Sequence, residues 1–188
     1  MGTVVITSIV CLVIVIILIA WFIGMYNGLV RERNEVKNSW AQIDVQLKRR
    51  HDLIPNLVET VKGYAAHERN TLDSVVQARS RAVSAQGVGE RAKAESELGG
   101  ALGRLMLVVE QYPDLKANQN FLALQEELTS TENKIGFARQ FYNDSVMKYN
   151  TRIQSVPTNI VAGMFSFQQE EFFELEEPAE RAVPQVKF

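Results

Sequence analysis

The sequence predicts an all-α protein with an N-terminal transmembrane helix, an antiparallel bundle of long helices and an irregular C-terminal tail. Three observations predict this fold. Residues 4–23 carry no charge, apolar residues recur at spacings of three and four between residues 29 and 153, and residues 26–157 show no sustained alternation of period two. The expected domains are a transmembrane anchor at 1–25, a helical bundle at 26–157 and an acidic, phenylalanine-rich tail at 158–188.

The uncharged run at the N-terminus is long enough to cross a bilayer. At a helical rise of about 1.5 Å per residue it spans a hydrocarbon core of roughly 30 Å. The anchor prediction is carried by Val4, Ile14, Trp21 and Ile23, with the amphipathic ring of Trp21 at the far interface. A cleaved signal peptide is disfavoured because no Lys or Arg precedes the run and no A-x-A cleavage site follows it.

Basic residues on one side of the run predict its orientation. Arg31, Arg33 and Lys37 follow the run closely, and none precedes it. Because basic flanks are retained on the cytoplasmic side, we expect the N-terminus outside and the helical domain in the cytoplasm.

From residue 29 to about residue 83 the apolar stripe is narrow enough to resemble a coiled-coil seam, and Pro55 interrupts it. Two interpretations stay open: Asp52 caps a new helix that has Pro55 in its first turn, or one helix kinks there with its face intact. We favour a break or strong kink near residues 51–55. Arg50 and Glu68 occupy stripe positions, so either both lie at the margin of the core with their charged ends in water, or the stripe is an interaction surface there; we favour the margin.

The later helices have clear punctuation. Residues 84–89 contain two glycines and predict a turn, and a helix is expected over about 90–111. Inside it, Gly99, Gly100 and Gly103 indicate either close helix packing or a local weak point. Tyr112-Pro113-Asp114 ends that helix, and a last helix is expected from about 115 to 153, ended by Val156-Pro157.

The composition excludes several kinds of site. Cys11 is the only cysteine, and His51 and His67 lack metal-binding spacings. No nucleophile motif such as G-x-S-x-G occurs, so we predict no catalytic residue, no metal and no cofactor. Residues 158–188 hold two basic residues against six glutamates, which argues against nucleic acid as a partner.

Aromatic and amide residues are the candidate contact residues instead. Two Tyr-Asn pairs stand seven residues apart and share one helix face, so they either fill the core or form a polar ladder that fixes a subunit contact. Five phenylalanines in the tail suggest docking on its own bundle, on a neighbouring subunit or on the membrane surface, with an anionic leaflet least favoured. The candidates are Tyr142, Asn143, Tyr149, Asn150, Phe165, Phe167, Phe172, Phe173 and Phe188.

Several motifs resemble those of the LemA family of bacterial membrane proteins. They are Tyr26-Asn27-Gly28-Leu29-Val30, Trp40-Ala41-Gln42-Ile43-Asp44, Asp52-Leu53-Ile54-Pro55-Asn56-Leu57, Tyr112-Pro113-Asp114-Leu115-Lys116-Ala117-Asn118, Leu128-Thr129-Ser130-Thr131-Glu132-Asn133-Lys134-Ile135, the double Tyr-Asn and the closing Pro184-x-Val186-x-Phe188. The resemblance covers nearly the whole chain. It implies a single-pass protein of the inner membrane, an antiparallel four-helix bundle and no established enzymatic activity.

Three functions are compatible with a membrane-anchored helical bundle that has no predicted catalytic site. The leading hypothesis is a non-enzymatic scaffold or assembly protein that acts through self-association or protein contacts at the membrane. The second is a regulatory adaptor of a membrane enzyme such as a quality-control protease, and the third is a small-ligand sensor or enzyme. The expected partners are the lipid bilayer, further copies of the chain and a membrane protein, without nucleic acid.

Overall fold

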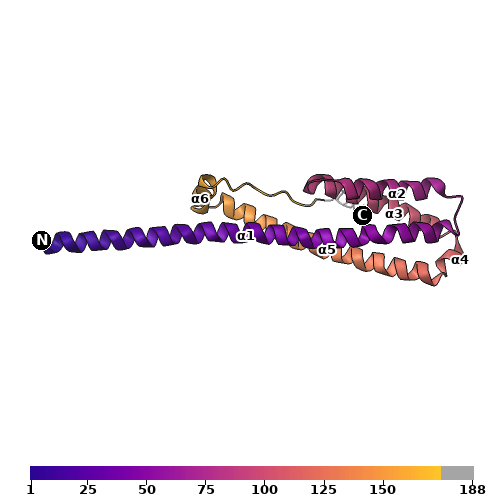
Figure 1. Cartoon of the computed structure of the whole chain (residues 1–188), viewed down its shortest axis with the longest axis horizontal. Helices are drawn as coiled ribbons and strands as arrows, with labels where there is room; N and C mark the ends of the chain where they lie inside the picture. The colour runs from indigo at the N-terminus through magenta and orange to yellow at the C-terminus, as the bar shows by residue number, and fades with distance from the viewer. Residues whose placement is uncertain (175–188) are drawn as a thin grey trace, which may run out of the picture. The chain divides into compact units, whose positions relative to one another are not determined.

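The structure is a computed structural model that describes residues 1–174, and within that range all regular structure is helical (Figure 1). The all-α prediction is therefore confirmed. The helices are α1 (Gly2–Lys62), α2 (Arg69–Ser84), α3 (Val88–Val109), α4 (Pro113–Lys116), α5 (Gln119–Gln154) and α6 (Thr158–Met164).

The chain divides into two compact units. The anchor unit consists of residues 1–39 and 143–170, and the bundle unit consists, within the described residues, of residues 40–142 and 171–174. The long helices α1 and α5 contribute one part to each unit.

The bundle unit is an antiparallel four-helix bundle made of the second part of α1, of α2 and α3, and of the first part of α5 (Figure 1). Its apolar stripes meet in one core, as the spacing of three and four predicts. The core residues are Ile54, Leu57, Val58, Val61, Ala65, Leu72, Val75, Ala78, Ala82, Ala94, Leu98, Ala101, Leu105, Val109, Leu115, Phe121 and Leu128.

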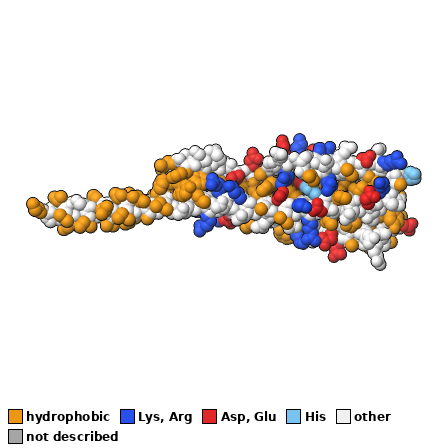
Figure 2. All heavy atoms as spheres, viewed as in Figure 1, with side chains coloured by type: hydrophobic (Ala, Val, Ile, Leu, Met, Phe, Trp, Pro, Cys, Tyr) orange, Lys and Arg blue, Asp and Glu red, His pale blue; other side chains and the backbone are white. Residues whose placement is uncertain are grey.

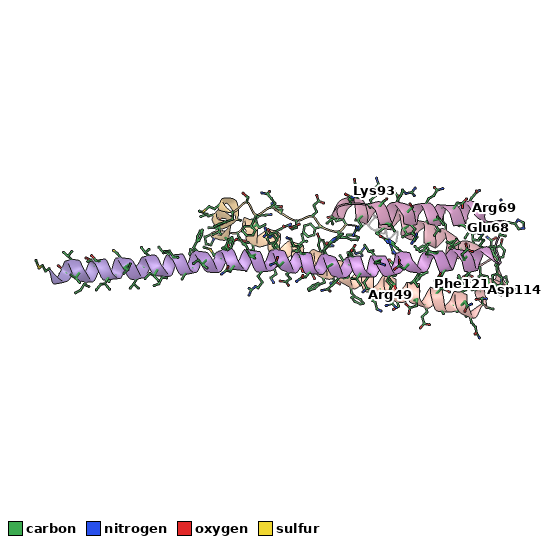
Figure 3. The ribbon with its side chains drawn as sticks, viewed as in Figure 1. Arg49, Glu68, Arg69, Lys93, Asp114 and Phe121 are labelled. Carbon is green, nitrogen blue, oxygen red and sulfur yellow. The ribbon has the colours of Figure 1, made fainter. Side chains whose placement is uncertain are left out.

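The helix ends follow local chemistry. Gly87 adopts a φ of +80° directly before α3, a conformation that favours glycine. Pro113 begins α4, where its missing N–H costs no hydrogen bond. The side-chain oxygen of Asn118 accepts a bond of 3.1 Å from the backbone N–H of Phe121 in the first turn of α5. Phe121 itself is buried in the core (Figure 3).

Of the two interpretations left open at Pro55, the structure has the single helix: α1 runs unbroken through Pro55 to Lys62, so the helix does not break near residues 51–55. A proline inside a helix lacks the N–H that would bond the carbonyl four residues back, which here belongs to His51. The guanidinium of Arg79 on α2 supplies the missing donor: its Nε lies 2.7 Å from the carbonyl oxygen of His51. Asp52 does not cap a helix and instead bonds Lys48 at 2.8 Å.

The first true interruption lies at residues 63–68, between α1 and α2, which the apolar stripe did not predict. Tyr64 and Ala65 both donate backbone bonds to the carbonyl of Val61, which closes the end of α1. Ala65 is buried although it lies in this connection. The connection therefore inserts an apolar residue into the core, which is why the apolar pattern continues across a helix end.

The three glycines inside α3 do not mark close packing. A Cβ built on Gly99 or Gly103 meets nothing within 4 Å, and one built on Gly100 meets only the tip of Arg104 at 4.0 Å. Both glycine-bearing turns are exposed. The other interpretation, a locally weak helix, is the one that remains.

Candidate contact sites

A strap, residues 165–174, follows α6. It begins with a turn at residues 165–166 and continues without regular structure, and its first part packs in the anchor unit. The side-chain amide of Asn150 makes two hydrogen bonds with the backbone of Glu170, donating to its carbonyl and accepting from its N–H, each 2.9 Å long. The ring of Phe167 lies 5.8 Å from that of Tyr26, and the guanidinium of Arg33 stacks over it at 5.0 Å. The strap is thus held by its main chain and by one ring.

The last part of the strap packs in the bundle unit. The hydroxyl of Tyr142 donates a 2.8 Å bond to the carbonyl of Glu171. Phe173 is fully buried, and its ring centroid lies 5.8 Å from that of Trp40. Trp40 also packs against Tyr142 at 5.4 Å, and the guanidinium of Arg91 stacks on it at 5.5 Å.

These contacts place most of the predicted contact residues inside the chain's own fold. Tyr142, Tyr149, Asn150, Phe167 and Phe173 are buried, Asn143 is half-buried, and Phe165 and Phe172 remain exposed. Phe188 lies outside the described residues. Of the three docking places considered for the tail, the chain's own helices hold residues 167–173.

The two tyrosines differ in their hydroxyl groups. The Tyr149 hydroxyl is buried and has no hydrogen-bond partner among the described residues. Burial raises the pKa of Tyr149 above its usual value, the nearby Glu170 adds to this rise, and Arg33 opposes it. The ring of Tyr149 therefore fills the core, as the first of the two interpretations of the Tyr-Asn pairs expects, while its hydroxyl finds no hydrogen-bond partner among the described residues.

A buried ion pair explains why glycine stands at position 28 in the anchor unit. The guanidinium of Arg152 on α5 bonds the Glu32 carboxylate of α1 at 2.6 Å, and Glu32 is only 3% exposed. The guanidinium crosses α1 above Gly28, where an added Cβ would lie 2.5 Å from its Nη2. A side chain at this position would therefore require the guanidinium of Arg152 to shift.

A second buried charge cluster lies in the bundle unit. Glu95 on α3 bonds the guanidinium of Arg50 and accepts a 2.6 Å contact from the ring of His51. Arg50 also bonds the exposed carboxylate of Glu132 on α5. Burial would raise the pKa of Glu95, but the hydrogen bond of His51 and the charge of Arg50 outweigh it, so the pKa lies below its usual value.

This cluster corrects the expectation that Arg50 reaches water at the margin of the core, since its side chain is only 4% exposed. Glu68 is half-buried at the start of α2 and accepts a bond from the Tyr112 hydroxyl (Figure 3). The signal that was missed is Glu95, which stands three residues before Leu98 on the apolar face of its helix. When two apolar stripes each carry one charged residue and the charges are opposite, the two residues are expected to pair in the core.

An open apolar groove of about 590 Å³ lies between α1 and α5 of the bundle unit. Only one of its lining residues, Lys134, is charged. Phe137 and Val45 line it with exposed fractions of 75% and 63%. The side-chain oxygen of Gln46, also in the lining, is buried without a hydrogen-bond partner among the described residues. The remaining lining residues are Ala41, Gln42, Ala138 and Phe141.

A polar hollow of about 320 Å³ lies where α1, α2 and α3 meet in the same unit. Its charged groups are already paired in part, Lys48 with Asp52 and Arg91 with Asp44. Within residues 1–174, no group of three His, Cys, Asp or Glu side chains is arranged to hold a metal ion.

The comparison with known proteins decides the family. The model of the LemA family matches residues 39–188, which is most of the chain. The chain belongs to the LemA family. The resemblance noted in its motifs is therefore confirmed.

The relatives of this LemA-family chain include proteins with two different names. A protein LemA of Metamycoplasma hominis is 32% identical over 75% of this chain and 65% of its own length. The magnetosome protein MamQ 2 of Paramagnetospirillum magneticum is 28% identical over 88% of this chain and 70% of its own length. MamQ of Magnetospirillum gryphiswaldense is 27% identical over 82% of this chain and 66% of its own length. The chain thus spans about two thirds or less of two of these relatives.

The membrane prediction also has structural support. The helix α1 is the one helix in the described part of the chain that is long and apolar enough to cross a membrane, and its apolar end is near the N-terminus. The side chains of Val4, Ile14, Trp21 and Ile23 are each about half exposed or more. This LemA-family protein therefore carries an N-terminal candidate membrane anchor (Figure 2).

Proposed function

We propose that this protein is a membrane-anchored, non-enzymatic scaffold that acts through self-association. The observation that carries the proposal is the apolar groove at Phe137. A side chain of this size that is 75% exposed, beside an apolar groove, is typical of an interaction surface. The buried oxygen of Gln46 offers one oriented acceptor for a donor of the partner.

Another copy of the chain is the occupant that fits this groove. Its lining is apolar with a single positive charge, so it matches a surface of its own kind better than a strongly charged partner. Chains that share one bilayer meet at a raised effective concentration, so even a modest contact suffices. The MamQ relatives are named as magnetosome proteins.

The decisive measurement is the mass of the full-length protein in mild detergent by native mass spectrometry. We expect a discrete multiple of 21.2 kDa, and we expect Phe137→Glu to lower it to the mass of one chain. Leu107→Glu is the matched control, because Leu107 on α3 is 71% exposed and lies outside the groove. A wild-type monomer would overturn the proposal and favour an adaptor that binds a single membrane enzyme. An equal effect of both substitutions would show that self-association does not use the groove.

We further propose that the N-terminus lies outside the inner membrane and that the helical units lie in the cytoplasm. The exposed Arg31 and Lys37 on the body side of the apolar run support this orientation. A protease added to intact spheroplasts should remove a tag at the N-terminus and spare a tag at the C-terminus. The reverse pattern would overturn the orientation.

A small-ligand sensor is a second candidate, favoured by the polar hollow lined by Arg79, His51 and Arg91. Its volume of about 320 Å³ lies at the small end of ligand sites. A thermal-shift screen of small anions against the wild type and Arg91→Ala tests it. A stabilisation that Arg91→Ala abolishes would support the sensor, and no stabilisation by any anion would exclude it for that class.

A further inference from the structure

The stretch around α6 has no charge. Residues 153–169 contain no Asp, Glu, Lys, Arg or His, and the glutamates of the tail begin only at Glu170. The expectation that tail glutamates repel an anionic leaflet therefore does not apply to this stretch. It is also the longest uncharged stretch of the chain after the anchor itself.

The helix α6 has two apolar faces rather than one. Val161 and Ala162 are buried against the anchor unit, at 1% and 2% exposure. Facing away from it, Ile160 is 61% and Met164 66% exposed, and Val156, four residues before Ile160, is 78% exposed. A surface helix normally turns polar residues outward. Here the outward side carries Ile160 and Met164, with Asn159 as its one polar side chain, and none of the described residues covers the two apolar ones.

The position of α6 within the anchor unit identifies what covers this face. Phe165, directly after α6, lies 6.2 Å from the ring of Phe22 and 4.6 Å from that of Tyr26. Phe22 lies at the body-side end of the apolar run, and Tyr26 is one helical turn further along, about 6 Å. The apolar side chains of the anchor and of α6 form one continuous surface (Figure 2). The outward face of α6 is therefore level with the edge of the bilayer that takes α1.

We propose that α6 is a second membrane contact, in which Val156, Ile160, Met164 and Phe165 enter the headgroup–acyl boundary of the same bilayer. Aromatic rings and the apolar face of a surface helix are suited to this depth. The contact binds lipid through apolar burial without selecting a headgroup charge. Together with α1, this contact attaches both segments of the anchor unit, residues 1–39 and 143–170, to the membrane.

Depth-dependent fluorescence quenching tests the contact in the full-length protein. In a Cys11→Ser background, Ile160→Cys carries an environment-sensitive dye, and the protein is reconstituted in phosphatidylcholine vesicles. We expect quenching by a nitroxide on the lipid acyl chain to be several-fold stronger than at the control, and quenching by iodide in the water to be several-fold weaker. The control is Leu107→Cys on α3, which is similarly exposed at 71%.

Two results would overturn the proposal. Equal iodide quenching at positions 160 and 107 would show that α6 is in water. A blue-shifted dye that neither quencher reaches would show that protein covers the face. Met164→Cys repeats the measurement at the next turn of the same face. Reconstitution at one chain per vesicle separates the contact from self-association, because lipid quenching should persist there even if the scaffold proposal fails.

Discussion

The anchor unit and the bundle unit each bury a carboxylate–arginine pair, but they enclose it differently. In the bundle unit both oxygens of Glu95 have partners, and its Arg50 is only 4% exposed. In the anchor unit Arg152 is 35% exposed and one oxygen of Glu32 has no partner among the described residues. Both partners of the bundle pair are therefore sealed in the core, whereas in the anchor pair only the carboxylate is buried and the arginine reaches water. Charge should matter far more for stability in the first case.

The largest effect should come from removing Glu95. Glu95→Ala leaves the Arg50 guanidinium buried without its main partner, and we expect a loss of about 3–5 kcal/mol in the free energy of unfolding. Glu97→Ala, two residues away, removes only the exposed pair with Arg81 and should cost about 0.5 kcal/mol or less. Thermal melts followed by circular dichroism of the full-length protein in detergent compare the two. Similar melting temperatures would show that the bundle pair is not sealed.

Acid should weaken the bundle unit through the same carboxylate. The folded pKa of Glu95 lies below its usual value of 4.5, so its ionised form is favoured by folding. The stability it contributes is therefore present above pH 4.5 and is lost as the pH falls through the lower, folded pKa. Unfolding curves in urea from pH 7 to pH 3 should show this slope for the wild type and a shallower one for Glu95→Gln. Parallel curves would contradict the assignment.

The two buried tyrosines also compare the two units, and their substitutions should change stability by smaller amounts and in different directions. Tyr142→Phe in the bundle unit removes the bond to Glu171 and leaves that carbonyl without its donor, which should cost about 1 kcal/mol. Tyr149→Phe in the anchor unit removes a buried hydroxyl that has no partner among the described residues, so stability should stay unchanged or rise. Melting temperatures of the two variants decide this. A loss at Tyr149 equal to that at Tyr142 would reveal an unseen partner of the Tyr149 hydroxyl.

Two glycines should respond in opposite directions, by the smallest amounts. Gly103→Ala on α3 meets open space and removes backbone freedom from the unfolded chain, so it should stabilise by up to about 1 kcal/mol. Gly28→Ala pushes Arg152 away from Glu32 and should destabilise by about 1 kcal/mol. Chemical denaturation of each variant against the wild type measures both signs. Stabilisation by Gly28→Ala would show that Arg152 moves aside without cost.

The apolar spacing and the turn residues were sufficient for the architecture. The periodicity placed the core residues, and Gly87 and Pro113 marked real helix ends. The continuity of α1 was not predictable locally, because the donor that replaces the proline's missing N–H is Arg79 on another helix. The interruption at 63–68 was hidden because Ala65 keeps the apolar pattern.

The contact residues were predicted by type more than by role. Tyrosine, asparagine and phenylalanine at helical spacing identified the groups that hold the strap, such as Asn150 and Phe173. Their partners are backbone atoms and rings distant in sequence, which spacing alone does not specify. The apolar groove was missed for a related reason. Val45 and Phe137 lie on different helices, and each alone is an ordinary exposed apolar residue.

The bond from Arg79 to the His51 carbonyl also sets an order of events on the ribosome. Pro55 is synthesised well before Arg79, so the carbonyl of His51 has only water as a donor until α2 has emerged and folded back. The apolar run can enter the bilayer during that interval. The body-side end of α1 still lacks the packing against other helices that stabilises a helix in water. The longest helix of the protein is thus completed by a residue that is translated after it.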